Sequence, residues 1–109
     1  GQAKSVMKLL PVIDTIERAT ANVPEKLADN AWVKGVSGLN KQLDKQLKEI
    51  GLEKINTKPG TLFNPELHQA VQFDEEAEGE KEVIAEELRA GYTLNGSVIR
   101  DAMVKVTRQ

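Results

Sequence analysis

The dipeptide Asn95-Gly96 constrains the fold of this chain more than any other local feature. A two-residue type I′ turn needs positive φ at both central residues, and Asn followed by Gly tolerates this well. Beyond the turn, apolar and more polar residues alternate from Ala102 to Thr107, as in a strand with one buried face. The sequence therefore predicts a β-hairpin followed by a half-buried strand.

Residues 1–50 have the period of amphipathic helices instead. The apolar residues that recur at helical spacing in the first segment are Val6, Leu9, Leu10, Ile13 and Ile16. Pro11 interrupts this segment, and it either kinks one helix or occupies the first turn of a second. We predict a connection over residues 20–29.

A second helix is predicted to begin after Asp29 or Asn30, either of which can cap it. Its apolar stripe consists of Trp32, Val36, Leu39, Leu43, Leu47 and Ile50. Gly51 follows directly, as a residue that can end a helix in the left-handed conformation. Two helices with one stripe each cover those stripes only in part. We therefore expect either a second copy that completes a four-helix bundle or a β layer that folds over the helices.

The spacing of the apolar residues changes from helical to strand-like after Gly51, which indicates an α+β chain. We predict a helical dimerisation region over residues 1–51 and a compact, mostly antiparallel β-domain over residues 52–109. Short strands are expected at residues 52–55, 70–73 and 83–88, with a turn at 57–60 and a solvated acidic loop at 74–82.

Composition excludes several classes of function. The net charge is −2, and 15 basic residues are interspersed with 17 acidic ones, so no basic block is available for nucleic acid. Cysteine is absent, which excludes disulfides and thiolate metal sites and fits a reducing compartment. No apolar run reaches the length of a membrane span. His68 is the only histidine, and we interpret it as a half-buried brace of the turn after Asn64-Pro65. We expect no catalytic residue, no metal and no cofactor.

Four segments share a further pattern, and they occur at residues 9–19, 42–55, 63–71 and 91–106. The last reads Gly-Tyr-Thr-Leu-Asn-Gly-x-x-Ile-Arg-x-Ala-Met-Val-x-Val, and the first contains Leu-Leu-Pro-Val-Ile-Asp. In this order they resemble the GrpE family, the nucleotide exchange factors of DnaK-type chaperones. Asn64 stands where that family more often has Asp, a small departure because both residues cap turns.

The resemblance implies a cytoplasmic co-chaperone that is a homodimer and performs no bond chemistry. Its β-domain is expected to dock on the ATPase domain of the chaperone and open the nucleotide cleft, so that ADP leaves. The implied chaperone-binding residues are Gly51, Pro65, Leu88, Tyr92, Asn95, Gly96, Ser97 and Arg100. The expected dimer interface is Leu9, Ile13, Ile16, Trp32, Val36, Leu39, Leu43, Leu47 and Ile50.

Two interpretations stay open at this point. Arg100 either pairs with a carboxylate of the chaperone or braces the β-domain through Asp101 or Glu87. A dimeric adaptor whose β-domain binds some other protein is the alternative function. We also expect the chain to lack most of the long N-terminal helix of the family, since only eight residues precede the Leu-Leu-Pro segment.

Overall fold

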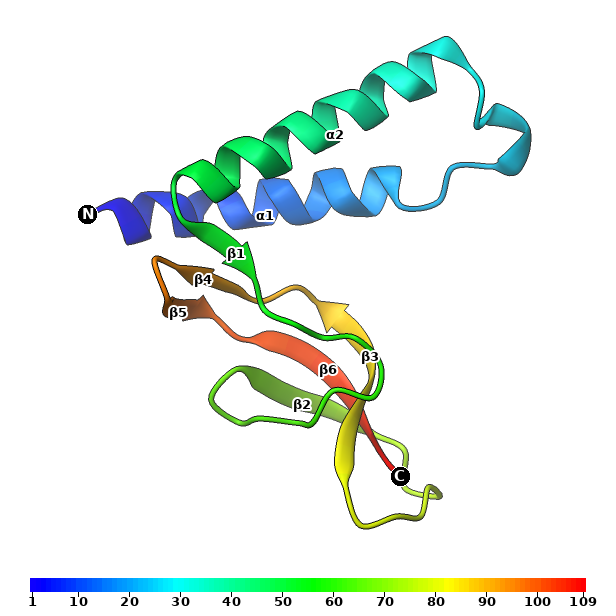
Figure 1. Ribbon diagram of the computed structural model, residues 1–109, viewed down its shortest axis with the longest axis vertical. Helices are drawn as coiled ribbons and strands as arrows, with labels where there is room; N and C mark the ends of the chain where they lie inside the picture. The colour runs from blue at the N-terminus through cyan, green and yellow to red at the C-terminus, as the bar shows by residue number, and fades with distance from the viewer. The chain divides into compact units, whose positions relative to one another are not determined.

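The computed structural model describes residues 1–109, which divide into a helical unit, Gly1–Gly51, and a β-unit, Leu52–Gln109 (Figure 1). The helical unit holds two α-helices, and the β-unit holds two three-stranded sheets. The predicted α+β class is therefore confirmed. No helix of the chain has both the length and the apolar character that crossing a membrane requires.

The helical unit is a pair of helices, α1 (Gln2–Thr20) and α2 (Ala31–Glu49), joined through the short 3-10 helix η1 (Glu25–Leu27). Pro11 lies inside α1, so the segment is one helix rather than two. Asn30 caps α2, because its side-chain oxygen accepts from the N–H groups of Trp32 and Val33 at 3.0 and 3.2 Å. The Asn40 amide donates to the Thr20 hydroxyl at 2.8 Å and ties the two helices together.

Gly51 ends α2 as the sequence predicts. Its φ is 91°, and its N–H donates to the carbonyl of Lys48 at 3.0 Å. This left-handed conformation is available to glycine without a steric penalty, so the chain can turn sharply from α2 into the first strand.

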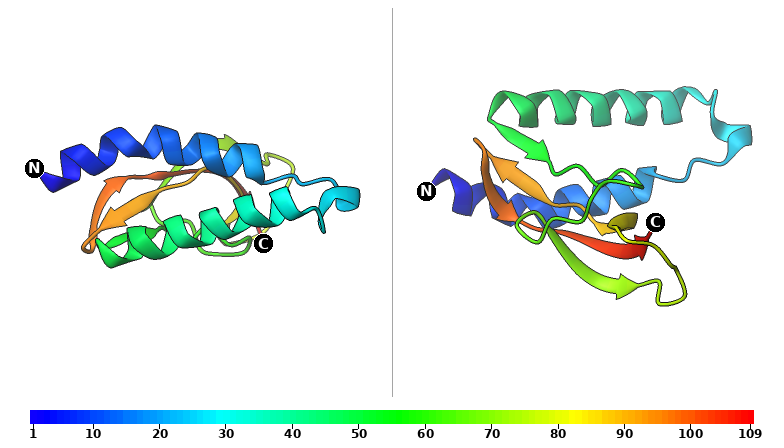
Figure 2. Two further views of the ribbon diagram at one scale, coloured as in Figure 1. Left: turned by 90° about the horizontal axis from the view of Figure 1, so that it is seen from above. Right: turned by 60° about the horizontal axis from the view of Figure 1, so that its bottom comes forward.

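The β-unit contains six strands, of which four are antiparallel to all their neighbours. They are β1 (Leu52–Lys54), β2 (His68–Phe73), β3 (Glu82–Arg89), β4 (Tyr92–Leu94), β5 (Ser97–Arg100) and β6 (Ala102–Arg108). One sheet has the order β1-β4-β5 and the other the order β2-β6-β3. Figures 1 and 2 both show β2 beside β6, and this pair is parallel. The local sequence did not indicate this parallel pair.

The core of the β-unit lies on one face of β6. Its buried residues are Ile55, Ile84, Ala102, Val104 and Val106, and Phe63, Leu67 and Ala70 pack against them. The predicted alternation along β6 is confirmed, because Met103, Lys105 and Thr107 are only partly buried. β3 shifts register twice against β6, between Ile84 and Glu86 and between Glu87 and Arg89. These bulges explain why β3 shows no clean alternation in sequence.

His68 is more buried than expected, with only 3% of its surface exposed. Its Nδ1 accepts from the backbone N–H of Asn64 at 3.0 Å, and Nε2 lies 2.9 Å from the carbonyl oxygen of Asn56. A backbone N–H can only donate, so the ring proton resides on Nε2 and is donated to Asn56. The predicted brace is therefore confirmed, and both ring nitrogens are engaged in it.

Candidate partner-binding surface

The hairpin around Asn95-Gly96 has the geometry that its sequence predicts. Both residues have positive φ, 50° for Asn95 and 86° for Gly96, as a type I′ turn requires. Asn95, Gly96 and Ser97 are all exposed. Leu94 pairs with Ser97 on one side and with Leu52 on the other, so the exposed turn is anchored by buried leucines of β1 and β4.

Tyr92 and Arg100 form the base of this hairpin. They are register partners, and the guanidinium carbon of Arg100 lies 5.4 Å from the centre of the Tyr92 ring. This geometry is a cation–π contact. Tyr92 is only 2% exposed, so it supports the hairpin from inside and offers almost no surface of its own.

Arg100 braces the β-domain through a backbone carbonyl, an acceptor that the sequence analysis did not consider. Its Nε and Nη2 groups donate to the carbonyl oxygen of Ala90 at 3.1 and 2.6 Å. The Glu87 carboxylate instead accepts from the Thr57 hydroxyl. A backbone carbonyl was the missed partner because the local sequence does not show where β5 passes the end of β3.

Ala90 and Gly91 connect the two sheets, and the joint is tightly packed. The carbonyl of Gly91 accepts from the N–H of Ile55 at 2.9 Å. A Cβ atom added to Gly91 would lie 2.2 Å from the backbone nitrogen of Ala102, so only glycine fits there. Three contacts hold this joint: the hydrogen bonds from Arg100, the hydrogen bond from Ile55 and the close approach at Gly91. Together they fix the direction in which the chain passes from β3 into β4.

Leu88 lies on β3 just before the joint and is 39% exposed, so it presents part of an apolar side chain at the surface. Pro65 is also exposed, and the carbonyl of Leu67 accepts from Ala102 at 3.0 Å. The segment after Pro65 therefore lies against the start of β6. Val98 on β5 is exposed as well and follows Ser97 directly, so it is a further apolar residue beside the turn.

The helical unit has an apolar face that its own two helices leave open. Trp32 is 76% exposed, and Leu39, Ile50 and Leu9 are exposed as well. A groove of about 610 Å³ runs between the helices and is lined by apolar side chains that include Ile16, Trp32, Val36, Leu39 and Leu43.

The residues of the expected interface differ in exposure. Ile13 is 5% exposed and packs mainly within this chain. Val12 is also exposed, and it lies three residues after Leu9 and four before Ile16, on the same helical stripe. Leu47 is partly buried, like Val36 and Leu43.

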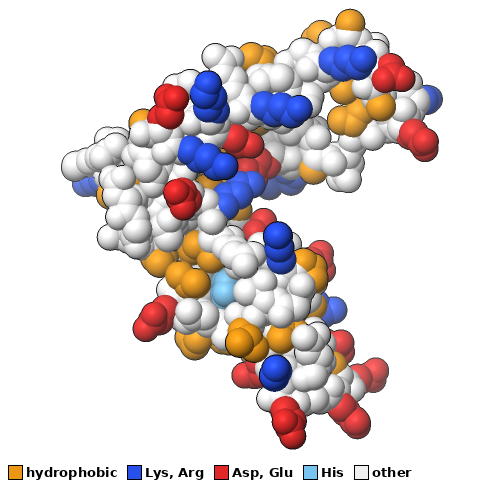
Figure 3. Space-filling view, viewed as in Figure 1, with side chains coloured by type: hydrophobic (Ala, Val, Ile, Leu, Met, Phe, Trp, Pro, Cys, Tyr) orange, Lys and Arg blue, Asp and Glu red, His pale blue; other side chains and the backbone are white.

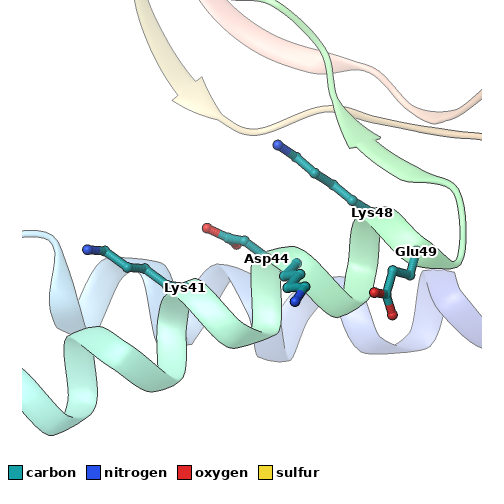
Figure 4. A pocket seen from close by; sticks show the side chains of 5 residues that line it. Lys41, Asp44, Lys48 and Glu49 are labelled. Carbon is teal, nitrogen blue, oxygen red and sulfur yellow. The ribbon is translucent and has the colours of Figure 1, made fainter.

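A shallow depression on α2 has a different character. It is lined by Lys41, Asp44, Lys45, Lys48 and Glu49, which all belong to α2, and Figure 4 shows Lys41, Asp44 and Lys48 on successive turns of this helix. Both charge signs intermix along this helix (Figure 3), and each lining residue is exposed. The depression is therefore part of a solvated helix face. In the whole chain, no group of three or more acidic or histidine side chains is arranged to hold a metal ion.

Comparison with known proteins agrees with the resemblance seen in the motifs. The two units are a helical pair and, after it in the chain, a small β-fold of two three-stranded sheets. The GrpE family model matches residues 1–108, and the chain belongs to the GrpE family.

Individual relatives support the same assignment. The chain is 46% identical over 101 residues to Protein GrpE of Halalkalibacterium halodurans, an alignment that covers 93% of this chain and 52% of the relative. It is 41% identical over 104 residues to Protein GrpE of Parasynechococcus marenigrum, with 94% and 47% covered. The chain thus spans about half the length of the curated relatives it matches.

Proposed function

We propose that this chain is a nucleotide exchange factor that binds the ATPase domain of a DnaK-type chaperone and releases ADP from it. The observation that carries the proposal is the family match over residues 1–108, which includes both the helical pair and the complete hairpin. The expected site of action is the cytoplasm.

The contact surface proposed for the chaperone is the exposed side of the hairpin end of the β-unit. Leu88 supplies an apolar anchor there, and the Asn95-Gly96 turn with Ser97 supplies exposed polar backbone and side chains. Interfaces concentrate their binding energy in a few such anchors. Tyr92 and Arg100 contribute indirectly, because they hold the hairpin and the Ala90 joint in place. Gly51 and Pro65 are proposed as chaperone-binding residues as well, as the resemblance implies.

The mechanism needs no bond chemistry. A protein that binds the open state of a nucleotide cleft more tightly than the closed state shifts the equilibrium toward the open state. By linkage, the same coupling free energy lowers the affinity of the chaperone for ADP. A rigid contact surface suits this role, since a surface that deformed with the cleft would not distinguish its two states.

A homodimer belongs to this proposal. The open groove of the helical unit and the exposed Trp32 and Leu39 form a contiguous apolar face. Large exposed apolar patches mark interaction sites. A second copy that presents the same face would complete the four-helix bundle expected from the two stripes.

The test is the rate at which labelled ADP leaves a DnaK-type chaperone when the chain is added. The proposal expects faster release that saturates with the concentration of the chain. An adaptor that binds the chaperone elsewhere, or binds another protein, would leave the ADP release rate unchanged.

A further inference from the structure

A second surface lies where β3 begins and β6 ends. This end of the sheet is far from the joint at Ala90 and Gly91. It consists of residues 71–82 and 106–108, called here the acidic end. A cavity of about 280 Å³ opens within it, and its lining includes Phe73, Asp74, Glu75, Glu82, Thr107 and Arg108. β6 is seven residues long, so the acidic end lies about 20 Å from the joint at Ala90. The proposed chaperone surface does not use it.

The loop of the acidic end is held in place at both of its ends. The Asp74 N–H donates to Val106 at 2.9 Å, and the Thr107 hydroxyl donates to the Asp74 carboxylate at 3.2 Å. At the other end, Lys81 and Gln109 exchange two backbone hydrogen bonds of 3.1 and 3.0 Å. The cavity therefore has walls set by hydrogen bonds, which preorganise it for a ligand.

The charge of this loop is not neutralised within the chain. Between residues 74 and 82 the acids are Asp74, Glu75, Glu76, Glu78, Glu80 and Glu82, and the only base is Lys81. The ion pair of 3.8 Å between Lys34 and Asp29 belongs to the helical unit and involves none of these residues. Acidic side chains gather at the lower end of the β-unit in the view of Figure 3. The surface therefore favours a positively charged partner.

The acidic end also contains an open strand edge. β2 pairs only with β6, so its other edge has no partner in the chain. Phe73 is 56% exposed at the end of β2, and Val71 is exposed at the register shift between Ala70 and Gln72. An edge strand with exposed apolar side chains is a template for an added extended segment. A second copy is disfavoured as the occupant, because it would bring two strongly acidic loops together.

We propose that the acidic end binds an extended, basic segment of a partner protein. The main chain of that segment pairs with the open edge of β2. One of its Lys or Arg side chains enters the cavity, where the Phe73 ring offers a cation–π contact and Asp74, Glu75 and Glu82 offer carboxylates. Arg108 lines the same cavity and opposes the incoming cation.

The probe is a synthetic peptide of alternating valine and arginine, blocked at both ends, titrated into the chain by calorimetry. A peptide with glutamine in place of every arginine is the matched control, and we expect it to bind at least about tenfold more weakly, a difference of one decade in Kd. Binding of the arginine peptide should weaken as salt is raised. Amide exchange of residues 69–73 should slow when the arginine peptide is added.

Three variants locate the site. Phe73→Ser and the pair Glu75→Gln with Glu82→Gln should each weaken arginine-peptide binding about tenfold or more, the loss of one good contact. Arg108→Gln should strengthen it. The pair Glu25→Gln with Glu66→Gln changes the net charge by the same amount at exposed positions elsewhere, and should leave binding unchanged.

Equal binding of the arginine and glutamine peptides would overturn the proposal. An equal loss of peptide affinity in the Glu75 and Glu82 pair and in the Glu25 and Glu66 control pair would also overturn it. That result would show that binding responds only to net charge. ADP release should be unaffected by Phe73→Ser, so failure of this proposal is distinguishable from failure of the exchange function.

Discussion

The guanidinium of Arg100 donates two hydrogen bonds to the carbonyl oxygen of Ala90, from Nε at 3.1 Å and from Nη2 at 2.6 Å. Ala90 lies two residues after Leu88, at the joint between the two sheets of the β-unit. Hydrogen bonds from a charged donor are stronger than neutral ones. Arg100 therefore links the hairpin to the strand that carries the exposed leucine.

Replacing Arg100 by lysine should destabilise the β-unit. An ammonium keeps the positive charge but cannot present two donors in a planar fork, and it stacks less well on Tyr92. We expect a loss of about 2 kcal/mol in the free energy of unfolding, the range for hydrogen bonds to charged groups. Urea unfolding followed by circular dichroism measures it. Arg108→Lys, at an exposed position, is the control, and equal stability of the two variants would show that the brace contributes nothing.

His68→Ala should destabilise the chain by about 2–4 kcal/mol, because it leaves the buried N–H of Asn64 and the carbonyl of Asn56 without their partners. Thermal unfolding monitored by circular dichroism is the measurement. His68→Gln is the informative second variant, since its amide can replace one of the two hydrogen bonds and should recover part of the loss. Native stability in His68→Ala would contradict the bracing role.

Gly51→Ala should cost about 1 kcal/mol or more of stability, because φ is 91° and a side chain resists that conformation. Gly51→Asp should show the same loss and, under the proposed function, an additional loss of chaperone affinity. Gly35→Ala is the matched control, since a Cβ there meets no atom within 4 Å and favours the helix. Affinities measured by titration calorimetry separate the two effects. Identical affinity of the alanine and aspartate variants would remove Gly51 from the proposed interface.

Leu43→Asp should convert the proposed dimer into monomers. An unpaired carboxylate in an apolar interface costs several kcal/mol. Light scattering gives the mass of each form directly. Lys41→Asp, two residues away on the exposed and charged face of α2, should keep the mass of the unchanged chain. A Leu43→Asp protein with the unchanged dimer mass would place the interface elsewhere.

Several parts of the fold follow from local chemistry alone. Asn95-Gly96 forms its turn because these two residues tolerate positive φ, and the Lys58-Pro59-Gly60-Thr61 turn closes with a 3.0 Å hydrogen bond for a related reason. Asn30 caps α2 through its own side chain. The alternation along β6 marks its buried face correctly, because that face meets a single core.

Other features depend on contacts between distant segments and carry no local signal. The parallel pairing of β2 with β6 joins residues more than 30 positions apart, and the register shifts in β3 disrupt its alternation. The Arg100 acceptor is a backbone carbonyl. Every residue has such a group, so the side chains in the sequence do not indicate which carbonyl accepts. Tyr92 belongs to the hairpin motif, yet its side chain is buried. A motif in the sequence does not distinguish residues that contact a partner from residues that support the fold.

The central claim is tested most directly by the release of labelled ADP from a DnaK-type chaperone, measured by stopped flow with the unchanged chain and with Leu88→Ala. The account predicts that the unchanged chain accelerates release and that Leu88→Ala needs a higher concentration for the same rate, with native circular dichroism and an unchanged mass. An ADP release rate that does not respond to the unchanged chain at any concentration would contradict it.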